Sequence, residues 1–329
     1  MSYDTEIENS TKNGILGTPD IYDFRDTPNE ELFGQFYEFC RENLDSHFKL
    51  GSISQNIFLF RNSLTINAMA GFAKNFHVIL INSGLMMNCI ENYLKNENLD
   101  NYIISKFLDI TEKLDNQISA LAFQVTTQFT YYHELAHLLQ FNKTLVESEL
   151  QERSTAEANF DLQKHKLEIN ADTYAAISIA SHLEQYIEKM YGAEITETIT
   201  NDIIKVLGAC LLNYIVNFND DTNIYFKEKT HPHPFLRTLN IILNISTHIE
   251  KMPYFKKHNI ELNGREIFKN ITDFYQNLED EGIFKTKFSD LVYKNTDFQK
   301  DIVEYLEELL IFDDTNFEDA MNIWNKHII

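Results

Sequence analysis

Two histidines and a glutamate stand close together in the string YYHELAHLLQ at residues 131–140. His133 and His137 are four positions apart, so on a helix both imidazoles project from one face and can reach a single metal ion. Glu134 lies about 100° around the helix from His133, near such an ion without ligating it. Neutral imidazole suits Zn²⁺, and a carboxylate beside a zinc-bound water can take up its proton. The string therefore predicts a zinc site with two histidine ligands and Glu134 as general base.

The same string has a plainer interpretation. An H-E-x-x-H pattern arises by chance in some chains, and a histidine pair on a helix can be solvated or hydrogen-bonded in a core. The surrounding segment is apolar, however, and burying two imidazoles and a carboxylate without a partner is costly. We therefore favour the metal site.

A catalytic zinc site needs a third protein ligand and an open position for water. The metzincin pattern would place glycine at 140 and histidine at 143, and the sequence has Gln140 and Lys143 there, which excludes that class. The next candidate ligand is Glu168. Asp172, one helical turn further on, would accept a hydrogen bond from a ligating imidazole and fix its tautomer. Taken alone, these two acids would form a solvated helix face, but their position after H-E-x-x-H favours a ligand.

Residues 168–172, EINAD, match the E-x-x-A-D form of gluzincin metallopeptidases of the HtpX/CAAX-prenyl-protease type. Residues 67–85 resemble that family's N-A-F-A strand followed by an edge strand ending in G-L. Residues 230–232 with Arg237 resemble its H-P-x-x-x-x-R segment. The segments occur in the family's order over about residues 60–245. The chain also resembles soluble phage-exclusion proteases of the Lit type, which carry H-E-x-x-H.

The resemblance, combined with the residue chemistry, implies a mechanism of peptide hydrolysis. Zn²⁺ held by His133, His137 and Glu168 would lower the pKa of its bound water toward about 7. Glu134 would polarise that water for attack on a peptide carbonyl and then pass the proton to the leaving amine. Zn²⁺ is thus the expected cofactor.

The segment around residue 231 carries the remaining candidate site residues. His231 is the first candidate for a second donor to the oxyanion and His233 the next, although His-Pro-His-Pro could simply form an extended or turn segment. Arg237 would either pair with a site carboxylate or cap a helix. Phe76–Asn82 is expected to be the sheet edge that binds substrate in extended form, and it could equally be an ordinary core strand.

Hydrophobic patterning predicts the elements that position these residues. Helical spacing is found over residues 31–44, 92–115, 118–141, 167–191, 203–218 and from about 235 onward. Strand patterns cover residues 57–60, 63–69 and 76–82. The predicted fold class is α+β and mainly α-helical: a zincin core with an active-site helix, a small mixed or antiparallel sheet with a substrate edge strand, and a helical C-terminal region.

Three regions are predicted along the chain. Residues 1–28 lack periodic hydrophobicity and are expected to be a mobile or loosely docked lead-in. Residues 29–249 would form the zincin-like metallopeptidase domain, and the amphipathic, acidic residues 250–329 a helical C-terminal subdomain. The polar segment 143–164 is expected to be a loop, a lid or an exposed helical insertion. This segment and the C-terminal region are where a regulatory partner or ligand would act.

Composition limits the possible partners and compartments. The 329 residues include 28 basic and 50 acidic side chains, a net charge of −22. So acidic a chain repels phosphate backbones, which argues against nucleic-acid binding. The charge hints at basic substrates, but we favour solubility as its role. Three widely spaced cysteines form neither a disulfide framework nor a metal clip, which favours a reducing compartment.

The N-terminal sequence is acidic and polar, unlike a signal peptide. Each apolar stretch is expected to be too short or too polar to span a bilayer, which needs about 20 apolar residues. A soluble, cytoplasmic protein without membrane contact is therefore expected, whereas HtpX-type enzymes carry membrane helices.

These inferences predict a soluble zinc-dependent endopeptidase that acts on a protein or peptide substrate and is regulated and narrow in specificity. Two alternatives stay open. One is a non-catalytic regulatory or binding protein on a zincin scaffold, against which Glu134 argues because structural zinc does not need it. The other is a site-specific protease of phage defence or a toxin, which shares the chemistry.

Overall fold

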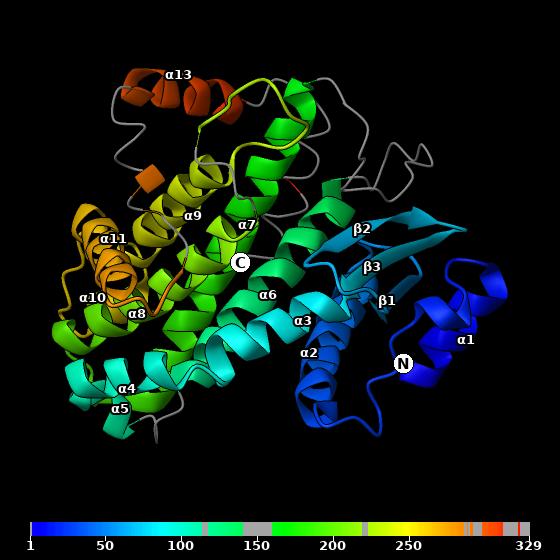
Figure 1. Ribbon diagram of the computed structural model, residues 1–329, viewed down its shortest axis with the longest axis horizontal. Helices are drawn as coiled ribbons and strands as arrows, with labels where there is room; N and C mark the ends of the chain where they lie inside the picture. The colour runs from blue at the N-terminus through cyan, green and yellow to red at the C-terminus, as the bar shows by residue number, and fades with distance from the viewer. Residues whose placement is uncertain are drawn as a thin grey trace. The chain divides into compact units, whose positions relative to one another are not determined.

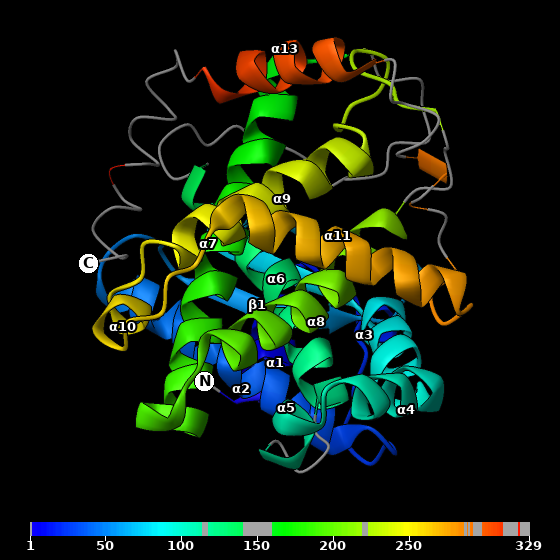
Figure 2. The same ribbon diagram turned by 90° about the vertical axis from the view of Figure 1, so that its left-hand side faces the viewer.

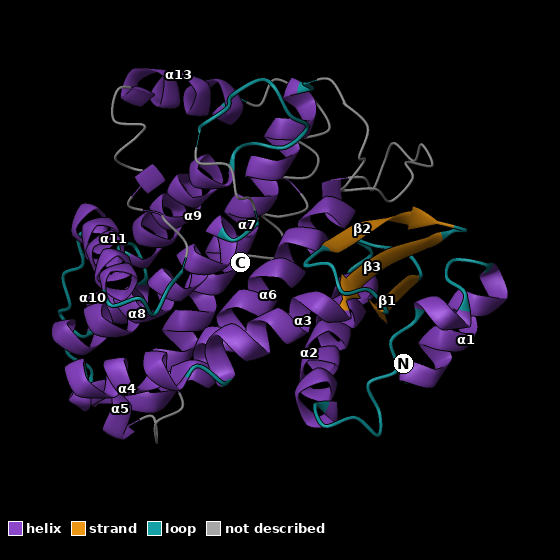
Figure 3. Ribbon diagram, viewed as in Figure 1, coloured by secondary structure: helices purple, strands orange, loops and turns teal. Residues whose placement is uncertain are grey.

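The structure is a computed structural model that describes residues 2–113, 118–140, 160–218, 223–285 and 298–311, together with residues 288, 290, 291 and 322. The described chain is mostly helical, with one small mixed sheet of three strands (Figures 1 and 3). The α+β, mainly α-helical class is therefore confirmed.

The chain divides into two compact units. Among the described residues, the first unit contains residues 2–88, 130–140 and 322, and the second contains the described residues of 89–129 and 160–311. Helix α6 (Ile118–Gln140) contributes to both, because its residues from Thr130 onward belong to the first unit.

The sheet belongs to the first unit and has the strand order β1-β3-β2. β1 (Asn56–Arg61) is parallel to β3 (Phe76–Asn82), and β2 (Ala68–Ala73) is antiparallel to β3. Lys74 and Asn75 join β2 to β3, and both have positive φ (49° and 70°). Positive φ at both turn residues is what a two-residue type I′ hairpin requires.

Two predictions about the strands are wrong. The strand predicted over 63–69 begins only at Ala68, because pairing with β3 extends from Ala68 opposite Ile81 to Ala73 opposite Phe76. Phe76–Asn82 is the central strand and not the sheet edge. Its uninterrupted apolar run is typical of a strand covered on both faces and paired on both sides.

The outer edge of β1 is covered by residues near the N-terminus. The Tyr3 hydroxyl oxygen accepts a hydrogen bond from the Phe60 N–H (3.2 Å), and Glu6 Oε2 accepts one from the Phe58 N–H (3.3 Å). The Tyr22 N–H donates to the Phe60 carbonyl (2.8 Å). β2 is the other outer strand of the sheet, and within the described part of the chain β3 is its one neighbouring strand.

Helix α2 (Glu30–Lys49) and the last part of α6 complete the first unit. Tyr131 of α6 packs against Phe39 of α2 and Phe58 of β1, with ring centroids 5.6 and 6.3 Å apart. Tyr131 is fully buried. These contacts fix the rotation of α6 immediately before the H-E-x-x-H residues.

The lead-in predicted for residues 1–28 is instead partly a docked helix, α1 (Tyr3–Asn13). Glu6 is fully buried, and its Oε1 lies 2.9 Å from Nη1 of the buried Arg41 on α2. Besides the packing of the Tyr3 ring on Phe24 and Phe60, polar bonds hold α1, so a search for apolar periodicity misses it. The domain boundaries predicted at 29 and 249 stay a prediction.

The second unit consists of helices. Helix α3 (Ser83–Cys89) lies in the first unit except for Cys89, where the second unit begins. A π-helical turn (Ile90–Leu94) follows, and the described helices of the second unit are α4 (Glu97–Lys106), α5 (Leu108–Lys113), the first part of α6, α7 (Leu162–Tyr191), α8 (Glu197–Val216), α9 (Pro234–Ile249), α10 (Pro253–Lys257), α11 (Gly264–Asp280) and α13 (Gln299–Leu310). Helix α7 packs on α9, and α8 packs on α11 (Figure 2).

The long helices confirm the predicted helical patterns, with shifted ends. The pattern over 92–115 is broken into short helices, because the π-helical turn and the residues around Phe107 interrupt it. Residues 143–159 of the predicted polar segment lie outside the described residues, and its last residues, from Leu162, begin α7.

One described helix, α8, is long and apolar enough to cross a membrane by length and composition, and 78% of its apolar window is buried inside the structure. Helix α8 begins several residues before the apolar segment predicted there, and the expectation that each apolar stretch is too short or too polar to span a bilayer stays a prediction. Core helices of water-soluble proteins pass the same test, so the localisation stays a prediction.

We predict that Arg41→Met destabilises the fold strongly. Removal of this guanidinium leaves the buried Glu6 carboxylate without its ion-pair partner, which costs about 3–5 kcal/mol. Arg25→Met is the matched control, because Arg25 forms exposed ion pairs that contribute at most about 1 kcal/mol. Urea unfolding followed by circular dichroism measures both losses.

The loss caused by Arg41→Met should depend on pH. Burial raises the pKa of Glu6 to about 7 against the opposing effect of Arg41. A carboxyl group with a raised pKa in the folded state stabilises the fold more as pH falls and it takes up a proton. The loss should therefore be smaller at pH 5 than at pH 8, and equal losses at both values would contradict this account.

Candidate functional site

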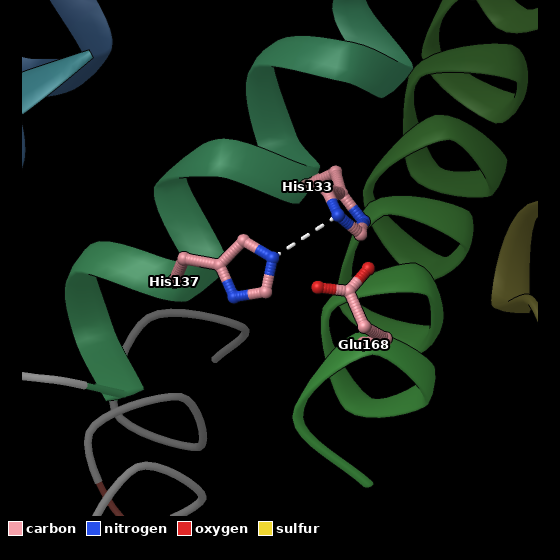
Figure 4. A group of neighbouring side chains, drawn as sticks. All are labelled: His133, His137 and Glu168. Atoms are coloured by element: carbon pink, nitrogen blue, oxygen red, sulfur yellow. Dashed lines mark hydrogen bonds between the residues drawn. The ribbon is translucent and has the colours of Figure 1, made fainter. Parts of the chain in front are cut away.

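His133 and His137 are both buried near the C-terminal end of α6, and their Nε2 atoms lie 3.1 Å apart (Figure 4). Two nitrogens that bind one tetrahedral zinc ion at their usual bond lengths are about 3.3 Å apart. The two imidazoles are thus spaced like two ligands of a single ion.

Gln140 orients the His137 ring. The Oε1 atom of Gln140 lies 2.8 Å from His137 Nδ1. Because an amide oxygen can only accept, Nδ1 carries the hydrogen and Nε2 keeps its lone pair for a metal. In the sequence, Gln140 serves only to exclude metzincins, and the orienting role is expected of Asp172. Its spacing of three residues from His137 on a helix is the signal that could have identified it.

Glu168 lies in the second turn of α7. The side chain of Asp161 caps this helix by accepting hydrogen bonds from two backbone N–H groups of its first turn, which fixes where α7 begins. One ligand atom each of His133, His137 and Glu168 lies within 4.8 Å of the other two, and all three residues are buried. Figure 4 shows the carboxylate directed toward both rings. This group could hold a metal ion.

Asp172 is fully buried and pairs with Arg237 of α9. The Nε and Nη2 atoms of Arg237 each donate to an Asp172 carboxylate oxygen at 2.8 Å, and Nη1 lies 3.7 Å from Glu168 Oε2. Of the two predicted roles for Arg237, the structure therefore shows pairing with acidic residues. The predicted bond from a ligating imidazole to Asp172 stays a prediction.

The two histidines of the His-Pro-His-Pro segment lie in different surroundings. His231 Nε2 is 3.7 Å from Glu168 Oε1, and its side chain is 32% exposed. His233 is buried, and its Nδ1 accepts a hydrogen bond from the Phe235 N–H (3.1 Å), which caps α9. Geometry thus places His231 beside the candidate ligand and gives His233 a structural role.

Several charged groups are buried around these residues. Glu134 on α6 and Glu168 and Asp172 on α7 are buried acids, and Arg237 commits both of its short hydrogen bonds to Asp172. Burying an acidic group is costly unless a compensating group is near, and a divalent cation held by the three candidate ligands would be one such group.

No known protein family matches the chain, and neither a curated protein nor a solved structure matches it. The similarity to gluzincin peptidases therefore rests on the sequence motifs quoted above.

We predict that His137→Ala and Glu168→Ala abolish tight Zn²⁺ binding. Each removes one of three ligands, so each should weaken affinity by more than the roughly 10–100-fold expected for a residue that only orients a ligand. Competition with a chromogenic chelator measures the affinity. His182→Ala, on the same helix as Glu168 and outside the group, should bind Zn²⁺ as the unaltered protein does. Unchanged binding by Glu168→Ala would remove residue 168 from the ligand set.

Gln140→Leu should weaken Zn²⁺ binding about 10-fold. The variant leaves His137 in place but removes the acceptor that fixes its tautomer and ring orientation. The same chelator competition measures this change, and Gln124→Leu, at an exposed position of α6, is the control. An equal effect of both substitutions would contradict an orienting role for Gln140.

Proposed function

We propose that this chain is a zinc-dependent endopeptidase with a gluzincin-type centre, in which His133, His137 and Glu168 hold Zn²⁺. The observation that carries the proposal is the buried group itself, with its ligand atoms within 4.8 Å of one another. Two imidazole nitrogens and one carboxylate oxygen are a donor set of catalytic zinc sites, where three protein ligands leave a fourth position open.

The chemistry of peptide hydrolysis follows from groups around this site. Bound Zn²⁺ supplies a Lewis acid that lowers the pKa of water at the open position to about 7. Glu134 directly follows His133 and is buried. Its carboxylate accepts the proton of the attacking water and returns it to the leaving amine. His231, whose Nε2 is 3.7 Å from Glu168, donates a hydrogen bond to the developing oxyanion.

Arg237 has a supporting role in this proposal. Its guanidinium holds Asp172 with two 2.8 Å hydrogen bonds and keeps a positive charge 3.7 Å from Glu168. A carboxylate with a cation nearby stays ionised, and an ionised carboxylate is the form that ligates a metal. Arg237 therefore favours the ligating state of Glu168 without contacting the substrate.

The proposed substrate is a protein or peptide bound in extended form along β2. This strand belongs to the same unit as His133 and His137, and within the described residues its outer edge carries no neighbouring strand. An extended peptide can add to such an edge through main-chain hydrogen bonds. β2 thus replaces Phe76–Asn82 in the substrate-binding role that the sequence analysis assigned.

We predict that Glu134→Gln separates metal binding from catalysis. The amide keeps the size of the side chain but cannot take up a proton, so peptide cleavage should fall at least about 100-fold while Zn²⁺ affinity changes little. The assay loads the full chain with Zn²⁺, incubates it with a peptide library and identifies new termini by mass spectrometry.

The control for this experiment is Glu91→Gln, because Glu91 forms an exposed ion pair with Lys95. It should cleave the library as the unaltered protein does. If the unaltered protein binds Zn²⁺ and cleaves nothing, the chain is a binding protein and the proposal fails. If Glu134→Gln retains cleavage, Glu134 is not the base.

A further inference from the structure

Helix α13 contacts the beginning of α7 through one buried histidine. His165 lies one turn before Glu168 and is fully buried. Its Nδ1 is hydrogen-bonded to the Tyr305 hydroxyl of α13, and its Nε2 lies 2.7 Å from the Lys229 carbonyl oxygen. Figures 1 and 2 both show α13 beside the N-terminal end of α7. His165 therefore joins α7, α13 and the connection that contains Lys229.

The bonding partners define the tautomer of His165. A backbone carbonyl can only accept, so Nε2 carries the hydrogen and donates it to Lys229. Burial lowers the pKa of His165, which favours the neutral ring. In that ring Nδ1 has a lone pair, and the Tyr305 hydroxyl donates to it. Both ring nitrogens are thus used to connect segments of the chain.

Further contacts hold the connection, residues 224–231, which we term the strap, against α13. The Phe226 ring packs against the Tyr305 ring with centroids 5.4 Å apart. Lys227 Nζ lies 2.7 Å from Glu308 Oε2. The strap is therefore tied to α13 by an aromatic contact and an ion pair, and to α7 by the hydrogen bond from His165.

The strap ends at His231, and His231 Nε2 lies 3.7 Å from Glu168 Oε1. Glu168 is on the turn of α7 that follows His165. The two residues that the proposed function places at the metal and at the oxyanion therefore sit on the two segments that His165 connects.

We propose that Tyr305 is a positioning residue of this site. Through His165, it holds the first turns of α7 and the strap together, so that Glu168 and His231 keep their relative places. This inference rests on the proposed function and adds to it that the C-terminal helix α13 is required for a well-formed site. Tyr305 acts through another residue and has no contact with the reacting atoms.

Tyr305→Phe tests this proposal, because it keeps the ring against Phe226 and removes only the hydroxyl. The matched control is Tyr254→Phe, whose hydroxyl donates to the Gly192 carbonyl (2.8 Å) beyond the other end of α7. Two properties of the full chain are measured: amide hydrogen exchange by mass spectrometry over residues 162–168 and 224–231, and Co²⁺ affinity from its visible spectrum.

Tyr305→Phe should speed exchange in both segments and weaken Co²⁺ binding, each about five-fold, the factor that one neutral hydrogen bond represents. Tyr254→Phe should change neither. Unchanged exchange in Tyr305→Phe overturns the proposal, and so does an equal effect of the two variants. Faster exchange with unchanged Co²⁺ affinity overturns the positioning role as well.

The Co²⁺ measurement on the unaltered protein distinguishes a failure of the proposed function from a failure of this inference. If the unaltered protein binds no Co²⁺, the metal centre is wrong, and the exchange rates alone decide whether Tyr305 holds the two segments. The route through His165 is tested by combining Tyr305→Phe with His165→Leu. Because residues that act as one unit are not additive, the double variant should exchange no more than about twofold faster than His165→Leu alone. A larger further increase overturns that route.

Discussion

The place of Glu168 relative to the two imidazoles is the constraint on which the rest of the candidate site depends. Helical spacing alone puts His133 and His137 on one face of α6. Glu168 is on a different helix, α7. The Asp161 cap fixes where α7 begins, and the Asp172–Arg237 pair joins α7 to α9 one turn after Glu168.

Buried polar pairs connect helices at several points of the described chain. Glu6 and Arg41 join α1 to α2, Asp172 and Arg237 join α7 to α9, and His165 with Tyr305 joins α7 to α13. Such pairs contribute little stability over an apolar substitute, but breaking one partner is costly. Because hydrogen bonds and ion pairs are directional, each pair also favours one rotation of its helix about the helix axis.

The parts of the fold that the sequence predicts well have strong local signals. β3 matches its predicted range of Phe76–Asn82, and α6 ends within one residue of its predicted end, because a long apolar period or an unbroken branched run needs no knowledge of distant partners. Glu168 could also be predicted from the sequence as the third candidate ligand, because it is an acid that follows the H-E-x-x-H residues and shares a helix face with Asp172.

The sequence is less informative where a partner far along the chain decides the outcome. The start of β2 is set by its register with β3, and the central position of β3 depends on β1 pairing with it. Helix α1 is held by a glutamate and a tyrosine, which no apolar pattern reveals. Gln140 has a local signal, its spacing of three residues from His137. Several kinds of polar group can orient an imidazole, however, and the three-dimensional structure is needed to show which one does.

The dependence of the strap on α13 has a consequence during protein synthesis. His133, His137 and Glu168 leave the ribosome well before Tyr305 does, and translation at about 5–20 residues per second separates residues 168 and 305 by roughly ten seconds. Through that interval a nascent chain would carry all three ligands on an unfinished scaffold. Until α13 has emerged, the chain lacks the Tyr305 bond, so the segments that His165 joins are held together less firmly on the ribosome than in the finished protein.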